Sequence, residues 1–303
     1  MPPIPPVGYG VWRVLPESRT ASMVEAAVGA GYRLVDTASV YGNEAGVGSA
    51  LAGVDDVLVT TKVWNDAHGR DRTLRSVDQS ARLLRRDVVD VLLLHWPVPA
   101  RDRYLETWLA MVELLEQGRV RAIGVSNFEP VHLDRLAAGS GVVPILNQVE
   151  LHPYLQQRRL RAEHDRRGIL TQAWSPLGQG TLLADDVLAR IAADHDVTPA
   201  QVVLDWHRHH GVATVPRTSN PARLAENLGA PGLALTAADH LALDALDRPG
   251  DAGRTGPRPD TFVDNDPPTP TLADDPADPA RTAHGTTFPQ VGAGPSLAGN
   301  TRN

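Results

Sequence analysis

Residues 89–95, VDVLLLH, form a short apolar run that ends in a histidine, and two earlier stretches have the same form. Residues 34–36, LVD, end in an aspartate, and residues 57–62, VLVTTK, end in a lysine. Short, apolar and β-branched runs predict parallel strands that are buried on both faces. Because the carboxyl ends of parallel strands meet at one edge of a sheet, the polar residues at or just after these ends are expected to lie together. These residues are Asp36, Tyr41, Lys62 and His95.

Segments of this kind alternate with helical patterns from Val7 to about Leu246. Eight strands that alternate with helices are typical of a closed (β/α)8 barrel. An open sheet that binds a dinucleotide is expected to carry GxGxxG after its first strand, and residues 8–12, GYGVW, lack that spacing. The pattern therefore favours an α/β fold of the TIM-barrel type over an open sheet. The expected strands are Gly8–Trp12, Leu34–Asp36, Val57–Lys62, Val89–Leu94, Ala122–Ser126, Ile145–Glu150, Leu170–Trp174 and Ala213–Pro216.

The clearest helical pattern covers Tyr104–Gln117, and Gly118 supplies its stop signal. Its large apolar residues recur at helical spacing, so they are expected to share one buried face. These residues are Leu105, Trp108, Leu109, Val112 and Leu115.

The four polar residues at the strand ends suit a proton transfer. A tyrosine with a pKa near ~10 is a poor acid at neutral pH, and a lysine close to Tyr41 is expected to lower that pKa by favouring the phenolate. Asp36 can hold Lys62 charged and oriented, and His95 can orient a carbonyl oxygen or help to move the proton. Taken singly, three of them have a plainer interpretation: Tyr41 could pack at a loop with its hydroxyl in water, Asp36 could cap a helix, and His95 could be a structural histidine.

Short motifs follow one another along the chain: DTASVYGNE at 36–44, TTKVWN at 60–65, LLLHWP at 92–97, GVSNF at 124–128, NQVELHP at 147–153, AWSPLG at 173–178 and VPRTSNPARLAEN at 215–227. Their sequence and order resemble those of the aldo-keto reductases, and most of all the bacterial branch that includes the 2,5-diketogluconate reductases. The likeness extends from about Gly8 to Phe262. It implies an NADPH-dependent reductase of aldehyde or ketone groups, with Tyr41 as general acid.

The same resemblance implies the residues that contact NADPH. Arg217 and Arg223 bring two cations to the last strand–helix junction, where a guanidinium can grip the 2′-phosphate through two donors. Asn220 is expected to cap a helix that begins at Pro221. The family usually has lysine where Arg217 stands and serine where Thr218 stands. The full implied set is Ser126, Asn127, Gln148, Trp174, Ser175, Leu177, Arg217, Thr218, Arg223, Glu226 and Asn227.

Tryptophans follow several of the expected strand ends. Trp12, Trp64 and Trp96, together with His95, are expected to line a pocket for a small carbonyl substrate with apolar surface. In the family that the chain resembles, loops that include the Gly250–Phe262 stretch set the choice of substrate.

Composition narrows the partners and the location. A formal charge of −7 and a pI near 5.9 argue against nucleic acid or an anionic membrane as the main partner. The chain has no cysteine and no apolar run of membrane-spanning length, and its N-terminus shows no signal peptide, so a cytoplasmic protein is expected. The resemblance implies a monomer. Residues 1–262 are predicted to form the barrel. Residues 263–303, rich in Pro, Asp, Gly and Ala, are predicted to be disordered.

Other functions have weaker support. His207, His209 and His210 do not have the i, i+4 spacing of a chelating pair, so no metal is expected. Ser175 lacks the GxSxG frame of a hydrolase nucleophile. Two alternatives remain: an NADPH-binding barrel that acts mainly as a regulatory or partner-binding subunit, and a barrel isomerase or hydrolase that uses Asp36 and His95 as acid and base.

Overall fold

The computed structural model describes residues 3–230, 232–233 and 235–263 of the 303-residue chain. All of them belong to one compact unit. The predicted disordered tail, residues 263–303, lies outside the described residues apart from Val263, so the tail and its boundary at residue 262 stay predictions. Among the described residues, no helix is long and apolar enough to cross a membrane.

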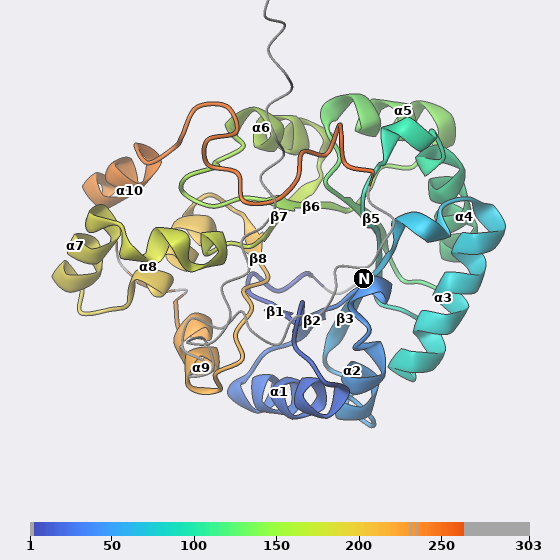
Figure 1. The fold of residues 1–303 in the computed structure, drawn as a ribbon, viewed down its shortest axis with the longest axis horizontal. Helices are drawn as coiled ribbons and strands as arrows, with labels where there is room; N and C mark the ends of the chain where they lie inside the picture. Colours follow the sequence, from blue (N-terminus) through green and yellow to red (C-terminus); the bar gives the residue numbers. More distant parts are fainter. Residues whose placement is uncertain (1–2, 231, 234, 264–303) are drawn as a thin grey trace, which may run out of the picture. The chain divides into compact units, whose positions relative to one another are not determined.

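Eight parallel strands follow one another around the sheet in chain order, which confirms the predicted (β/α)8 architecture (Figure 1). Each expected strand is present, with ends that differ by at most a few residues. The strands are β1 (Tyr9–Gly10), β2 (Leu34–Asp36), β3 (Leu58–Val63), β4 (Val91–Leu94), β5 (Ile123–Ser126), β6 (Leu146–Glu150), β7 (Leu170–Trp174) and β8 (Ala213–Thr214).

The last strand pairs with the first and closes the barrel. Val7 forms a parallel bridge with Thr214, and the Gly8 N–H donates to the Thr214 carbonyl at 2.8 Å. Further along, the Gly10 N–H donates to the Pro216 carbonyl at 3.1 Å. A side chain at Gly10 has no room, because its Cβ would lie 2.7 Å from the Val215 oxygen. Glycine at this position therefore lets the two backbones approach closely enough to complete the ring.

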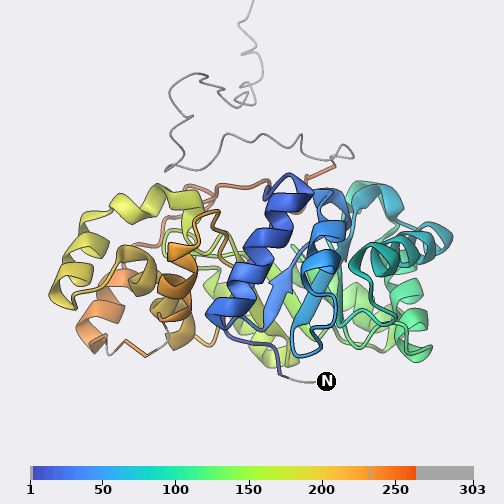
Figure 2. The same cartoon turned by 90° about the horizontal axis from the view of Figure 1, so that it is seen from below.

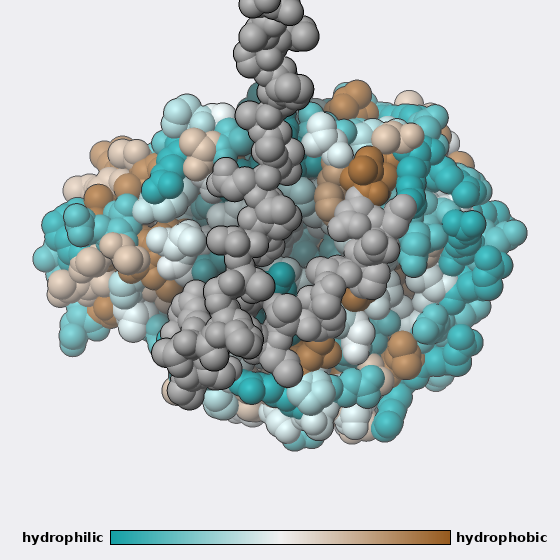
Figure 3. Space-filling model, viewed as in Figure 1, coloured by the Kyte–Doolittle hydropathy of each residue, from teal (hydrophilic) through white to brown (hydrophobic). Residues whose placement is uncertain are grey.

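Helices surround the barrel and cover its outer face (Figures 1 and 2). The outer surface over the α3 and α4 side of the barrel is mainly hydrophilic, as the teal rim in Figure 3 shows. The helices are α1 (Glu17–Ala30), α2 (Glu44–Ala50), α3 (Arg70–Leu84), α4 (Tyr104–Glu116), α5 (Pro130–Ser140), α6 (Arg158–Arg167), α7 (Asp186–Asp194), α8 (Pro199–His209), α9 (Ala222–Leu228) and α10 (Ala237–Asp244), with short 3-10 turns η1 (Ser39–Tyr41), η2 (Asn65–Ala67), η3 (Pro99–Arg101) and η4 (Gly178–Ala184).

Helix α4 has the predicted bounds to within one residue, but part of its predicted buried face is wrong. Trp108 is fully buried, as expected, whereas Leu109 is 44% exposed. The buried face is centred on Trp108, Met111 and Leu114, so it is rotated from the predicted stripe by about one residue. Tyr104 and Thr107 complete it, and neither was counted among the apolar positions.

The opening of the chain packs against the barrel interior at the end opposite the strands' carboxyl ends. Ile4 contacts a small cluster made by Val91 and Leu93 of β4 and Leu146 of β6. In Figure 2 the start of the chain lies at the lower edge, and the stretch near residue 260 lies at the upper edge. The polar strand ends described next belong to the upper edge.

Candidate active site

Three neighbouring strands and one short turn bring the four sequence-predicted residues together. Asp36 is the last residue of β2, Lys62 lies near the end of β3, and His95 directly follows β4. Tyr41 ends η1, which is tied to β3 because the Ser39 hydroxyl donates to the Lys62 carbonyl at 2.9 Å. The parallel register of β2, β3 and β4 explains why residues far apart in the sequence reach the same edge.

Lys62 is buried and paired with Asp36. Its Nζ donates to Asp36 Oδ1 at 2.6 Å and to the Thr37 carbonyl at 2.9 Å. The other carboxylate oxygen accepts from Gln148 Nε2 at 2.7 Å. Burial lowers the pKa of Lys62, and the Asp36 carboxylate opposes that effect. A cation is thus held in a place where little solvent can screen it.

Tyr41 lies directly above this pair. The Lys62 Nζ is 5.2 Å from the centroid of the Tyr41 ring, and the Tyr41 and His95 ring centroids are 5.8 Å apart. Burial, with a smaller contribution from the Asp36 carboxylate, raises the pKa of Tyr41 well above its ordinary value. The shift of the Tyr41 pKa is therefore opposite to the lowering that was expected from Lys62, because burial disfavours the charged phenolate.

His95 is an uncharged imidazole at neutral pH. Burial lowers its pKa well below the ordinary value, and the nearby Lys62 and His68 act in the same direction. Its Nδ1 is buried and has no hydrogen-bond partner within the described part of the chain. A neutral imidazole can donate one hydrogen bond and accept another, which suits contact with a carbonyl oxygen.

Ser126, Asn127, Gln148 and Trp174 form a network across the ends of β5, β6 and β7. The Ser126 hydroxyl donates to the Gln148 carbonyl at 2.8 Å, and Gln148 also donates to Gln172 Oε1 at 2.7 Å. The Asn127 amide donates to the His95 carbonyl at 3.0 Å and accepts from the Trp174 indole N–H at 2.8 Å. The structure thus brings these four residues together, and it uses the Asn127 side chain to join neighbouring strand ends.

The remaining sequence-predicted cofactor residues divide between two places. Ser175 and Leu177 follow β7, whereas the others follow β8 or belong to α9. The Ala222 N–H donates to Asn220 Oδ1 at 3.0 Å, so the Asn220 side chain satisfies a free N–H at the start of α9, although the helix begins at Ala222, one residue later than expected. The Glu226 carboxylate accepts from the Thr198 hydroxyl at 2.6 Å, which ties it to the start of α8. The residues after β8 are Arg217, Thr218, Arg223, Glu226 and Asn227.

Aromatic side chains gather beside the four polar residues. Trp64 lies 4.9 Å from the His95 ring, and Phe262 lies 4.4 Å from Trp96 between ring centroids. Trp174 packs against the same cluster. Trp12 is not part of it, and the Arg13 guanidinium lies 4.3 Å from its ring centroid instead. Of the predicted pocket tryptophans, the structure therefore joins Trp64 and Trp96 but not Trp12.

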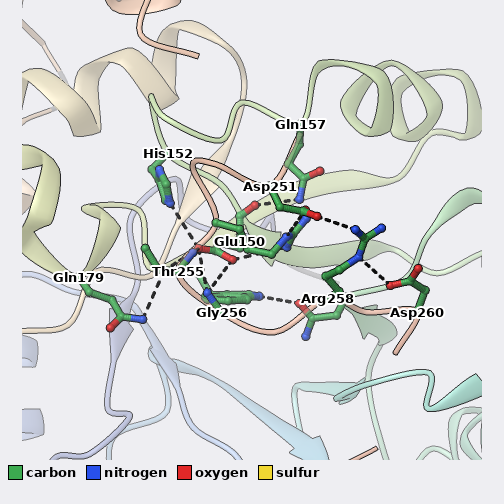
Figure 4. Close-up of polar contacts among 12 residues, drawn as sticks. Glu150, His152, Gln157, Gln179, Asp251, Thr255, Gly256, Arg258 and Asp260 are labelled. Atoms are coloured by element: carbon green, nitrogen blue, oxygen red, sulfur yellow. Dashed lines mark hydrogen bonds and ion pairs between the residues drawn. The ribbon is translucent and has the colours of Figure 1, made fainter. Parts of the chain in front are cut away.

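Glu150, at the end of β6, is a buried residue that the sequence reasoning did not single out. Its carboxylate accepts from the backbone N–H and the hydroxyl of Thr255, both at 2.5 Å, and from the Gly256 N–H at 3.1 Å (Figure 4). Burial raises the pKa of Glu150, but hydrogen bonds from His152, Thr255 and Gly256 outweigh it and leave the pKa lowered. The sequence did contain a signal for this residue: a carboxylate at the end of a buried strand needs hydrogen-bond donors close by.

The histidines at the end of α8 and directly after it take separate partners. His207 is buried against the Pro176 carbonyl at 3.2 Å, and His210 contacts Asp244 at 2.9 Å. His209 stacks on His240, with 3.7 Å between ring centroids. No group of three or more His, Cys, Asp or Glu among the described residues could hold a metal ion.

Comparison with known proteins agrees with this geometry. Residues 6–248 match the model of the aldo/keto reductase family. An aldo-keto reductase of Mycolicibacterium smegmatis is 46% identical over 263 residues, which cover 86% of this chain and 94% of that protein. Methylglyoxal reductase DkgA of Escherichia coli is 40% identical over 265 residues, with the same coverage. The resemblance seen in the sequence is confirmed, including its bacterial branch.

A solved structure is also similar. A variant of Gox0644 crystallised with NADPH superposes with a TM-score of 0.83 at 50% sequence identity, covering 86% of this chain and 95% of that chain.

Proposed function

Because the chain belongs to the aldo/keto reductase family, we propose that it reduces aldehyde or ketone groups of small molecules to alcohols, with NADPH as cofactor and Tyr41 as general acid. One observation carries the proposal. A buried Lys62–Asp36 ion pair lies beneath Tyr41, and a neutral His95 lies beside the Tyr41 ring. A protein that only bound a dinucleotide would gain nothing from a buried ion pair of this kind, which is costly to desolvate.

Each of the four side chains has a task in this reaction. The raised pKa of Tyr41 keeps its hydroxyl protonated at neutral pH, as a general acid requires. As negative charge develops on the carbonyl oxygen, Tyr41 donates its proton, and the buried Lys62 stabilises the phenolate that forms. Asp36 keeps Lys62 oriented. His95 donates a hydrogen bond that holds the carbonyl oxygen within reach of Tyr41.

The residues at the barrel mouth fit NADPH, which supplies the hydride when it is bound. The nicotinamide carries a primary amide, which needs both donors and acceptors, and Ser126 and Gln148 offer them at the ends of β5 and β6. The buried Nε2 of the adjacent Gln172 has no partner within the described residues. Arg217 and Arg223 carry the charge that a 2′-phosphate needs. The NADPH complex of Gox0644, which is 50% identical to this chain, supports NADPH as the cofactor.

The substrate class follows from the pocket. A mouth lined by Trp64, Trp96 and Phe262 favours a small carbonyl compound with apolar surface, shielded from water during the reaction. Methylglyoxal is a reasonable first substrate, since a 40% identical relative is named for its reduction. A monomeric state and a cytoplasmic location remain predictions.

The proposal is tested by following NADPH oxidation with wild type and Tyr41→Phe. The panel contains methylglyoxal, an aromatic aldehyde, an α-keto ester and 2,5-diketogluconate. We expect carbonyl-dependent oxidation in wild type and a loss of at least about a hundredfold in the variant, which is the typical contribution of general acid catalysis. NADPH binding, measured by quenching of protein fluorescence, should be nearly unchanged and so shows that the variant is folded.

Two outcomes would count against the proposal. A wild-type rate no higher than that of Tyr41→Phe on every carbonyl, with NADPH still bound, would favour a regulatory subunit. Turnover without any nicotinamide would favour an isomerase or hydrolase.

A further inference from the structure

We propose that Glu150 is a positioning residue whose carboxylate holds Arg254–Gly256 against the Trp174 indole, and that this contact sets both the affinity for NADPH and the size of carbonyl that is accepted. The inference rests on the proposed function. The name "latch" is used below for the contact between Glu150 and Arg254–Gly256.

The latch is built from hydrogen bonds to a charged and fully buried carboxylate. No part of the Glu150 side chain is exposed. Its Oε1 accepts both donors of Thr255, and its Oε2 accepts from the Gly256 N–H and lies 3.5 Å from Arg254 Nη1. Figure 4 shows Thr255 and Gly256 gathered around this carboxylate. Because a buried carboxylate without donors is strongly unfavourable, the backbone of the latch has little freedom to move away.

The latch holds the backbone of Gly256 in contact with the Trp174 indole. A Cβ at Gly256 would lie 2.4 Å from Cη2 of the indole, so the two groups are already in contact. The opposite side of the same indole is held by its N–H, which donates to Asn127 Oδ1 at 2.8 Å. Trp174 is therefore positioned from two directions, and one of them depends on Glu150.

The segment that Glu150 holds also carries the aromatic cover of the mouth. Within it, Arg254 and Arg258 both contact Asp251, and the Phe262 N–H donates to the Arg258 carbonyl at 3.0 Å. These contacts link Asp251, Arg254, Arg258 and Phe262, so we infer that the segment shifts as a unit. A shift at Gly256 is therefore carried to Phe262, which packs on Trp96. Glu150 thereby connects the position of the indole with the size of the opening.

Two substitutions and their combination test the latch. Glu150→Gln keeps the shape of the side chain but turns an acceptor into a donor that faces the Gly256 N–H. Gly256→Ala adds a methyl group that cannot be accommodated unless either the segment or the indole moves. While the latch is intact the segment is held, so the indole must move. Once the latch is released, the segment can move instead.

The measured quantities are the Kd for NADPH and the values of kcat and KM for methylglyoxal and for an aromatic aldehyde. For each single variant we expect the NADPH Kd and the aromatic aldehyde KM to rise about tenfold, with kcat for methylglyoxal within about threefold of wild type, since tenfold corresponds to about one charged hydrogen bond. In the Glu150→Gln background, Gly256→Ala should add less than about a twofold change.

Controls separate positioning from general loss of stability. Gly29→Ala adds the same methyl group where no atom lies within 4 Å, and it should change none of these constants. Thr255→Val removes one donor from the exposed side and leaves Glu150 in place. Thr255→Val should raise the aromatic aldehyde KM, as Glu150→Gln does. It serves as the test if Glu150→Gln does not fold.

The outcomes are distinguishable from those of the proposed function. If the double variant showed the product of the two single-variant changes in NADPH Kd and aromatic aldehyde KM, the latch would be overturned even in an active enzyme. Equal changes in KM for methylglyoxal and the aromatic aldehyde would overturn it as well. Wild type that oxidises no NADPH with any carbonyl would overturn the proposed function, while the NADPH Kd values would still decide the first half of the inference.

Discussion

Lys62 and Asp36 form an ion pair of 2.6 Å in which the lysine side chain is 0% exposed and the aspartate side chain 5%. Neither charge has access to enough water to be solvated in the absence of the other. Burying the two charges therefore costs desolvation free energy. The proposed chemistry explains why the pair is buried, because only a buried cation can strongly favour a phenolate.

Removal of one partner should destabilise the protein. Asp36→Asn leaves Lys62 charged and unpaired in the interior, and we expect a loss of about 3–5 kcal/mol in the free energy of unfolding, measured in urea. The double variant Asp36→Asn with Lys62→Met removes both charges and should recover most of that loss, while carbonyl reduction stays abolished. A double variant no more stable than Asp36→Asn would contradict this account of the pair.

The pH dependence of catalysis should reflect the opposite shifts of Tyr41 and His95. The raised pKa of Tyr41 keeps the acid protonated beyond the usual range, and the lowered pKa of His95 keeps the imidazole neutral below it. We expect kcat/KM for methylglyoxal reduction to stay nearly constant between about pH 6 and about pH 9, a range that reaches below the ordinary histidine pKa of about 6.5 and ends below the ordinary tyrosine pKa of about 10. An acid limb centred near the ordinary histidine pKa would show that His95 titrates normally.

Acid should destabilise the fold partly through His164. This side chain is buried, with Nε2 2.9 Å from the Asn147 amide nitrogen and Nδ1 2.8 Å from the Thr171 hydroxyl. Burial, aided by the Arg167 charge, lowers the pKa of His164 to about 4. As pH falls below about 6.5, His164 becomes protonated in the unfolded chain but stays neutral in the folded protein. The free energy of unfolding therefore decreases until about pH 4, where His164 also becomes protonated in the folded protein.

The size of this effect can be measured with His164→Gln. Between about pH 7.5 and about pH 5, wild type should lose about 2 kcal/mol more unfolding free energy than the variant, from about 1.4 kcal/mol per pH unit below the unfolded pKa. The exposed His209→Gln should behave like wild type. Identical losses in wild type and His164→Gln would mean that His164 is protonated in the folded protein.

Discrimination between the two nicotinamide cofactors should depend on Arg217 and Arg223. Replacing both with alanine should weaken NADPH binding at least about tenfold and leave NADH binding nearly unchanged, because only NADPH carries the 2′-phosphate that charged donors recognise. The variant Arg72→Ala with Arg75→Ala removes the same charge from exposed positions of α3 and serves as the control. Equal losses for NADPH and NADH would contradict the assignment.

The strands and the grouping of Asp36, Tyr41, Lys62 and His95 could be predicted because both depend on local pattern. A buried parallel strand shows itself as a short apolar run, and a barrel places every strand end on one face. Helix α4 shows the limit of this reasoning. Its buried face includes Thr107 and Tyr104, whose burial depends on neighbouring helices and cannot be read from their polarity.

The features that the sequence did not predict depend on tertiary contacts. The direction of the Tyr41 pKa shift depends on how deeply the ring is buried, which sequence spacing does not reveal. Trp12 follows a strand end as Trp64 does, yet it lies outside the aromatic cluster. Thr255 and Gly256, which donate to the Glu150 carboxylate, lie 105 and 106 residues further along the chain. Only the folded barrel reveals that they meet.

The β1–β8 seam has a consequence for the making of this protein. The ring closes only when Thr214 pairs back to Pro6 and Gly8, across a sequence separation of 208 residues for the longest of these contacts. A nascent chain from which β7 has emerged, but not yet β8, therefore has a sheet with two unpaired edge strands, β1 and β7. Such edges are templates for pairing with other chains. Such a nascent chain already contains Asp36, Tyr41, Lys62 and His95, but it lacks Arg217 and Arg223. The two arginines proposed for the 2′-phosphate are thus among the last site residues to be made, and they directly follow the strand that closes the ring.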